Sequence, residues 1–103
     1  MIKVSVMYPN GPDARFDERY YRDSHMPMVK KLMGDYCVSF AVDGAIAGDA
    51  GKNAPYIAMG HLFCESVDAF QAGFGPHTKE IMADIPNYTN QTPVIQMSEV
   101  LVG

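Results

Sequence analysis

The sequence has no tryptophan, only two cysteines and few charged residues, which make up 19% of its 103 positions. Because the first residues alternate in polarity and lack a basic, long apolar leader, Cys37 and Cys64 are expected to be free thiols in a reducing compartment. No stretch approaches the roughly 20 apolar residues that cross a bilayer. We therefore expect a cytoplasmic protein with no membrane partner.

Basic residues are also scarce. Eight lysines and arginines stand against twelve acidic residues, which gives a net charge of −4, and Lys30-Lys31 is the only adjacent basic pair. Binding to a phosphate backbone has little support in such a sequence, so nucleic acid is not an expected partner. No segment is repetitive, and 48% of residues are hydrophobic, which predicts one folded domain over residues 1–103.

Signatures of cofactor and metal sites are missing too. The glycines do not form a phosphate-binding loop that opens a helix, so nicotinamide and flavin binding are not expected. The three histidines have no short mutual spacing and no acidic partner at the distances of metal motifs. We predict no cofactor and no metal.

Apolar residues recur with two periods along the chain. Residues 1–8 alternate as in a strand, and from about Phe16 the spacing becomes helical. Pro27 lacks a backbone donor and disfavours helical geometry at the preceding residue, so a kink or restart is predicted just after His25. Gly34 is the expected helix stop.

The second half of the chain repeats the alternation. Strands are predicted at about 36–46, 56–64 and 94–102, and Ser66 is a candidate cap for a helix that is broken at Gly75-Pro76 and continues over about 77–84. The order β-α-β-β-α-β predicts a ferredoxin-like α+β fold, with an antiparallel four-stranded sheet and its helices on one face. Apolar residues on both sides of the strands, such as Ile95 opposite Val94, predict a homodimer through the sheet faces.

The segment Phe16-Asp17-x-x-Tyr20-Tyr21-x-x-x-His25-x-Pro27, with the later Gly34, resembles the opening motif of the EthD family, which takes its name from a gene cluster for ethyl tert-butyl ether degradation. The resemblance implies a dimeric α/β barrel with a cavity between helices and sheet in each subunit. Relatives on this fold include cofactor-free monooxygenases, polyketide cyclases, muconolactone isomerases and haem-degrading enzymes, so the fold does not select a reaction.

His25 is the strongest candidate for a catalytic residue, because an imidazole on the inner face of a kinked helix can act as general acid or base near neutral pH. Tyr21 shares its face and is predicted to orient a substrate oxygen, a role that passes to Tyr20 if the helix is rotated. The alternative is that His25 caps backbone groups at the break before Pro27 and that the tyrosines are core residues.

A soft pocket for a planar or hydrophobic ligand is predicted from aromatic, histidine and methionine side chains, although such residues usually form core. Its expected lining is Tyr20, Tyr36, Phe40, Met59, His61, Phe63, Phe70 and Phe74. Periodicity leaves open whether His61 faces this pocket or the dimer barrel. A haem-ligating role for His77 and a nucleophilic role for Cys64 are less favoured alternatives.

Two functions follow from this interpretation. The first is a cofactor-independent enzyme of small-molecule catabolism, an oxidoreductase or an isomerase, cyclase or lyase, that acts on a small hydrophobic or aromatic compound with His25 as general acid or base. The second is a non-catalytic protein that binds a hydrophobic ligand or assists a degradation pathway.

Overall fold

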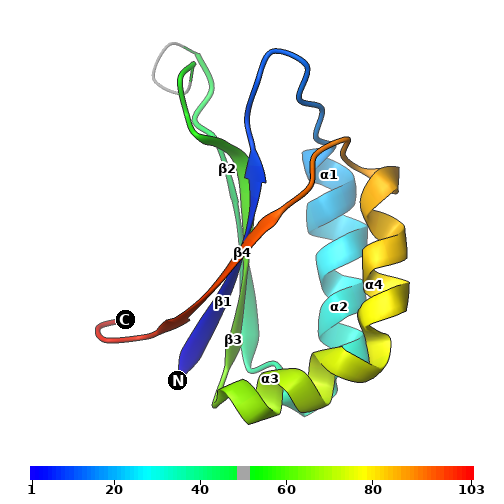
Figure 1. The fold of residues 1–103 in the computed structure, drawn as a ribbon, viewed down its shortest axis with the longest axis vertical. Coiled ribbons are helices and arrows are strands. Elements are labelled where there is room, and N and C mark those ends of the chain that lie inside the picture. The colour runs from blue at the N-terminus through cyan, green and yellow to red at the C-terminus, as the bar shows by residue number, and fades with distance from the viewer. Residues whose placement is uncertain (49–51) are drawn as a thin grey trace.

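The computed structural model describes residues 1–48 and 52–103, and one antiparallel sheet organises them in the order β2-β3-β1-β4. Its strands are β1 (Ile2–Pro9), β2 (Ser39–Gly44), β3 (Tyr56–Cys64) and β4 (Val94–Glu99). The α-helices are α1 (Glu18–Tyr20), α2 (Met26–Met33), α3 (Val67–Phe74) and α4 (Thr78–Asp84). Figure 1 shows α1, α2 and α4 on one side of the sheet, while the C-terminus projects on the other. The predicted ferredoxin-like α+β fold is confirmed.

The first helical unit is interrupted where Pro27 predicts a break. Asp17 caps α1 by accepting a hydrogen bond from the Tyr20 backbone N–H at 3.0 Å. A π-helical segment, Tyr21–His25, follows, and the Met26 N–H reaches back five residues to the Tyr21 carbonyl. Since Pro27 has no N–H to donate, the wider turn adapts the backbone before α2 restarts. The unit ends at Gly34, whose φ of 59° suits glycine.

The second helical unit begins at the predicted cap. The Ser66 hydroxyl accepts a hydrogen bond from the Ala69 N–H at 3.0 Å, and α3 runs to Phe74. A 3-10 turn, Gly75–His77, then leads into α4, so the break at Gly75-Pro76 is confirmed. A further 3-10 turn, Ile85–Asn87, carries the chain from α4 towards β4.

Two predicted strands are longer than the observed ones. The 3-10 turn Gly34–Tyr36 precedes β2, so Tyr36 is half exposed in a turn and not in the sheet. Strand β4 ends at Glu99 because its partner there is Ile2, the first residue of β1, and no further strand residue is available to pair. Beyond it, Leu101 and Val102 are 85% and 96% exposed.

The core lies between the helices and the facing side of the sheet. Alternate residues of β1 and β3 point into it, so that Val4, Tyr8 and Leu62 are almost completely buried against the helical residues Val29 and Met33. The helices leave the far side of the sheet open, and this side mixes polar residues such as Ser5 and Gln96 with apolar ones such as Phe63. No helix within residues 1–48 and 52–103 is long and apolar enough to cross a membrane.

Candidate functional site

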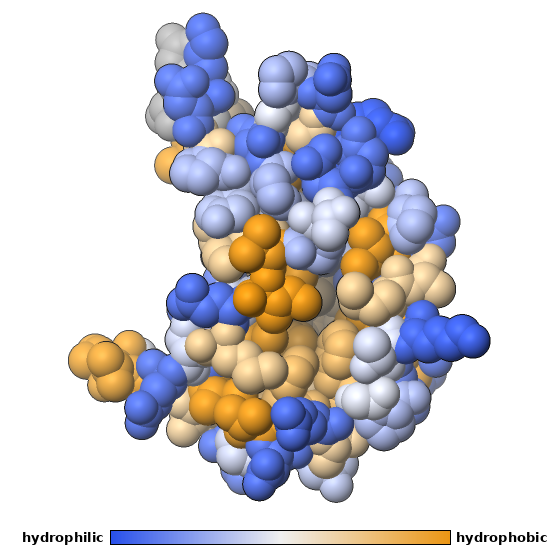
Figure 2. All heavy atoms as spheres, viewed as in Figure 1, coloured by the Kyte–Doolittle hydropathy of each residue, from blue (hydrophilic) through white to orange (hydrophobic). Residues whose placement is uncertain are grey.

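A small cavity lies between the helices and the sheet. Its volume is about 30 Å³, and its lining includes Val6, Leu62, Phe74, Ile81, Met82 and Ile95. Tyr8, Tyr21 and His25 add polar atoms to this apolar wall. Such a volume holds about two water molecules, so a larger ligand requires side-chain movement, which flexible methionines such as Met82 allow. Figure 2 shows apolar side chains gathered where β4 meets the helices, next to this cavity.

An imidazole in the cavity wall meets a carboxylate that lies behind it. The Nδ1 atom of His25 lies 2.9 Å from Oδ2 of Asp84, the last residue of α4. The two side chains are only 4% and 16% exposed. The π-helical turn and the end of α4 therefore bring together residues 59 positions apart in the chain.

Two further groups hold the Asp84 carboxylate. The Tyr20 hydroxyl donates to Oδ1 at 2.7 Å, and the Asn87 side-chain amide donates to the same oxygen at 2.9 Å. Partial burial alone would raise the pKa of Asp84, but the hydrogen bonds from Asn87, Tyr20 and His25 outweigh it and leave the pKa below its usual value. Asp84 is therefore a carboxylate at neutral pH.

Burial lowers the pKa of His25 below its usual value, against the opposing effect of Asp84. The imidazole is therefore neutral at pH 7. Because the carboxylate can only accept, Nδ1 carries the proton and donates a hydrogen bond to Asp84, which leaves Nε2 unprotonated and able to accept. The Tyr88 hydroxyl lies 3.3 Å from Nε2, a long hydrogen bond.

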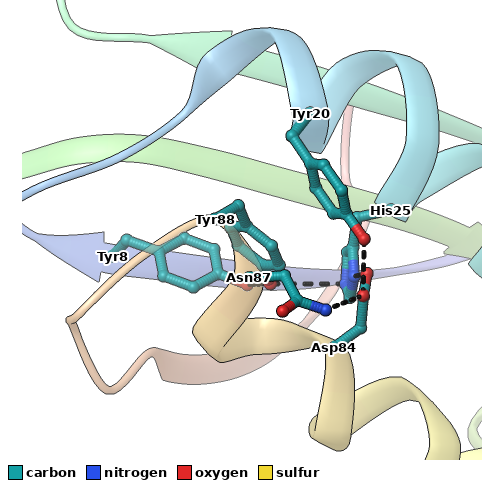
Figure 3. Close-up of polar contacts among 6 residues, drawn as sticks. All are labelled: Tyr8, Tyr20, His25, Asp84, Asn87 and Tyr88. Atoms are coloured by element: carbon teal, nitrogen blue, oxygen red, sulfur yellow. Dashed lines mark hydrogen bonds and ion pairs between the residues drawn. The ribbon is translucent and has the colours of Figure 1, made fainter.

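A row of phenols continues from the imidazole, as Figure 3 shows. The hydroxyls of Tyr8 and Tyr88 are 2.6 Å apart, and burial raises the pKa of both tyrosines, so both stay protonated at neutral pH. Since Nε2 accepts, Tyr88 donates to His25 and Tyr8 donates to Tyr88. The ring of Tyr21 stacks on that of His25, with 5.4 Å between centroids.

This arrangement suits proton transfer. Asp84 fixes the tautomer and orientation of the imidazole and stabilises the imidazolium that forms when Nε2 takes a proton. The neighbouring apolar wall limits competition from water, and the neutral phenols can donate hydrogen bonds to an oxygen.

Four of the predicted site residues gather here. His25, Tyr21 and Phe74 line the cavity, and Tyr20 binds Asp84. Tyr21 packs beside His25 in the wall, and Tyr20 acts on Asp84 instead of facing the cavity. The capping alternative for His25 is not needed to explain its position, because both its ring nitrogens face side-chain partners.

The remaining predicted lining residues lie elsewhere. Phe70 stacks on Phe74 but belongs to the core behind it, and Phe40 lies on β2 at the edge of the core. Tyr36 lies in its turn, away from the cavity. The other three predicted residues are Met59, His61 and Phe63. They lie on the uncovered face of the sheet, because the residues that alternate with them in β3 point inward.

The alternative sites gain no support. Burial raises the pKa of the Cys64 thiol to about 11, so it is protonated and a poor nucleophile at neutral pH. His77 lies in the turn before α4 and is not among the residues that line the cavity. Within residues 1–48 and 52–103, no cluster of three or more histidine, cysteine or acidic side chains could hold a metal ion.

Two hydrogen-bond partners of His25 were missed from the sequence. Asp84 and Tyr88 flank a short turn, and nothing in their local pattern distinguishes them from a solvated helix end and a loop aromatic. Their partner His25 is about 60 residues earlier, and only the antiparallel packing of the helices brings them together.

Comparisons with known proteins bear on this site. A family model described as the EthD domain matches residues 10–92, a range that includes Tyr20, His25, Asp84 and Tyr88. The chain belongs to the EthD family. An EthD-like protein from Ralstonia eutropha JMP134 is 47% identical, with a TM-score of 0.89 over 98% of this chain and 92% of that one.

More distant structures share the fold alone. An EthD-family protein from Bacillus halodurans C-125 is 14% identical, with a TM-score of 0.73 over 98% of this chain and 99% of its own. An antibiotic biosynthesis monooxygenase homologue from Bordetella bronchiseptica is also 14% identical, with a TM-score of 0.64 over 98% and 97%. The EthD chain thus has the fold of the dimeric α/β-barrel class. No curated protein matches it.

Proposed function

We propose that this EthD protein is a cofactor-independent enzyme of small-molecule catabolism, in which His25 moves a proton to or from a small hydrophobic or aromatic compound. The observation that carries the proposal is the buried His25–Asp84 pair, 2.9 Å apart, beside an apolar cavity that His25 itself lines. A base of this kind serves isomerisation, cyclisation, elimination and the deprotonation that precedes oxidation.

The charges around the cavity restrict the class of compound that can bind there. Among the described residues that line the cavity, none is a lysine, arginine, aspartate or glutamate, and the Asp84 carboxylate lies behind His25. An anionic ligand would lose its hydration without gaining a cation, at a cost of several kcal/mol. The favoured substrate is therefore uncharged, with one oxygen or one acidic C–H at the His25 end and an apolar body.

The second candidate is a non-catalytic ligand-binding or auxiliary protein. It is favoured by the Tyr88 hydroxyl, which already occupies Nε2 at 3.3 Å. If that hydrogen bond persists when a ligand enters, His25 orients the ligand and transfers no proton.

Solvent deuterium exchange separates the two candidates without knowledge of the natural substrate. Cyclohexanone in D₂O is a neutral apolar probe, and ¹H NMR follows loss of its α-protons. In the proposed reaction, Nε2 of His25 takes an α-proton, the enolate forms, and a deuteron returns to carbon. We expect catalysed exchange by the wild type and a loss of about 10²- to 10⁴-fold in His25→Gln. His77→Gln is the matched control and should retain the wild-type rate.

The binding candidate predicts a different pattern. Cyclohexanone would perturb cavity resonances in protein NMR, yet its exchange would be no faster than in buffer for wild type and His25→Gln alike. That result would remove the proton-transfer proposal for this class of carbon acid. Equal exchange by both proteins would remove His25 as the base.

We further propose that a second copy of the chain covers the open face of the sheet. The fold class supports this, and so do Leu101 and Val102, which lie almost fully exposed beside a groove of about 860 Å³ that Phe63 and Lys3 help to line. Sedimentation equilibrium at micromolar concentration is expected to give twice the chain mass, and a monomer would contradict the proposal.

A further inference from the structure

The open face of the sheet carries a second hydrogen-bonded histidine. Strand pairing places Ala41, His61, Ser5 and Gln96 side by side across the four strands. The neighbouring row towards the end of β1 brings Asp43 opposite Met59. His61 is therefore near the centre of the face, one row away from a carboxylate.

His61 connects these two rows. Its Nδ1 atom lies 2.9 Å from the Ser5 hydroxyl, and its Nε2 atom lies 2.8 Å from Oδ2 of Asp43. The His61 side chain is 13% exposed, whereas that of Asp43 is 61% exposed. The serine hydroxyl can donate to a neutral ring or accept from a protonated one, so both charge states of His61 satisfy these contacts.

A serine, a histidine and an aspartate in a row are also the parts of a hydrolase triad. Here Ser5 lies in the middle of β1, between β3 and β4, so its backbone groups belong to the sheet ladder. Within residues 1–48 and 52–103, the strand N–H groups around Ser5 are used in the pairing of β1 with β3 and β4, so they do not form a site for an oxyanion. The row therefore does not serve acyl transfer.

Covering the face changes the balance between the two charge states. In the proposed dimer, a second copy packed over this face would take water from the Asp43 side chain, which is 61% exposed in the single chain. A carboxylate that loses its water needs a cation. Within residues 1–48 and 52–103, the other charged groups beside this face are Lys3 and Glu99, which line one groove. Lys3 pairs with Phe63, two rows away from Asp43. Strand β4 presents Gln96 and Ser98 to the face, and neither side chain titrates. Among the described residues, protonated His61 is thus the cation that lies within hydrogen-bond distance of Asp43, at 2.8 Å.

We propose that self-association through the open face takes up protons at His61, so that the dimer is tighter at pH 6 than at pH 8. The inference rests on the proposed dimer and is independent of catalysis at His25. The sign follows from linkage: a proton held more firmly in the dimer than in the monomer strengthens association as the pH falls through the range in which histidine titrates, about pH 5 to 8.

Sedimentation equilibrium at pH 6, 7 and 8 and constant ionic strength tests the proposal. For the wild type we expect the dissociation constant to fall by about tenfold from pH 8 to pH 6. His61→Gln keeps hydrogen-bonding groups but cannot titrate, so the pH dependence should disappear. His77→Gln removes a histidine outside the face and should keep the wild-type dependence, which controls for the general loss of negative charge on acidification.

Asp43→Asn is the second variant, chosen because its exposed side chain makes it safe for folding. Without the carboxylate, a covered imidazolium has no counter-ion. The dissociation constant of Asp43→Asn should therefore stay the same or rise from pH 8 to pH 6. If the dissociation constant of His61→Gln or of Asp43→Asn depended on pH as that of the wild type does, the proton linkage would be overturned, although the proposed dimer would stand. A monomer at every pH would instead overturn the proposed dimer, and the linkage with it.

Discussion

Replacing Asp84 by asparagine removes the carboxylate that holds the site together. The carboxylate accepts three hydrogen bonds, from Tyr20 at 2.7 Å and from Asn87 and His25 at 2.9 Å. An asparagine can present its oxygen to only one side of this set. If the asparagine oxygen faces His25, its NH₂ group points at the donors of Tyr20 and Asn87. If the oxygen faces those donors, the NH₂ group points at Nδ1–H of His25.

The magnitude follows from these contacts. A hydrogen bond to a charged group contributes about 1.5–3 kcal/mol, and a buried donor left without a partner costs a similar amount. We therefore expect Asp84→Asn to lower the free energy of unfolding by about 2–4 kcal/mol. The asparagine also favours the other imidazole tautomer, with the proton on Nε2, so the exchange rate should fall by about 10²- to 10⁴-fold.

Urea unfolding and the cyclohexanone exchange assay measure these two effects. Asp23→Asn is the matched control, since Asp23 lies on the same helical unit but is exposed and paired with Arg22. It should leave both the unfolding free energy and the exchange rate close to the wild-type values, because an exposed ion pair contributes little to stability. A folded Asp84→Asn protein with wild-type exchange would refute the assignment of Asp84 as the residue that positions His25.

Three further outcomes are expected. Tyr88→Phe leaves the buried Tyr8 hydroxyl without its 2.6 Å partner and should cost about 1–3 kcal/mol in urea unfolding, with part of the loss recovered when Tyr8 also becomes phenylalanine. Because burial lowers the pKa of His25 below the unfolded value of 6.5, the unfolding free energy should decline as the pH falls below about 6.5, and less steeply in His25→Gln; parallel curves would contradict this. A side chain at Gly60 collides with the Tyr21 hydroxyl, so Gly60→Ala should lower the melting temperature and adding Tyr21→Phe should partly restore it; no loss would contradict the packing.

The parts of the structure that local signals determine were predictable. Pro27 and Gly34 set the break and the end of the first helical unit, Ser66 capped the next helix, and the alternating residues of β1 gave its two faces. Each of these features depends on neighbours within a few residues, so the pattern itself contains the information. The same local pattern placed His25 and Tyr21 on one face of the helical unit, where the structure has their rings stacked.

The parts that depend on long-range packing were not predictable. Asp84 and Tyr88 approach His25 only after both helical units pack on the sheet. For Met59 and Phe63, alternation showed that they share a face, but it could not show which face the helices cover. Tyr36 was misplaced because the turn at Gly34–Tyr36 delays the start of β2, and a strand-like composition hides such a turn.

The protonation state of His25 tests the central claim most directly. A long-range ¹H–¹⁵N correlation spectrum of the wild type at pH 7 reports which ring nitrogen carries the proton. We predict a neutral ring with the proton on Nδ1 and an unprotonated Nε2, and a pKa below 6.5 on titration. A ring protonated on both nitrogens at pH 7, or a neutral ring with the proton on Nε2, would contradict the account.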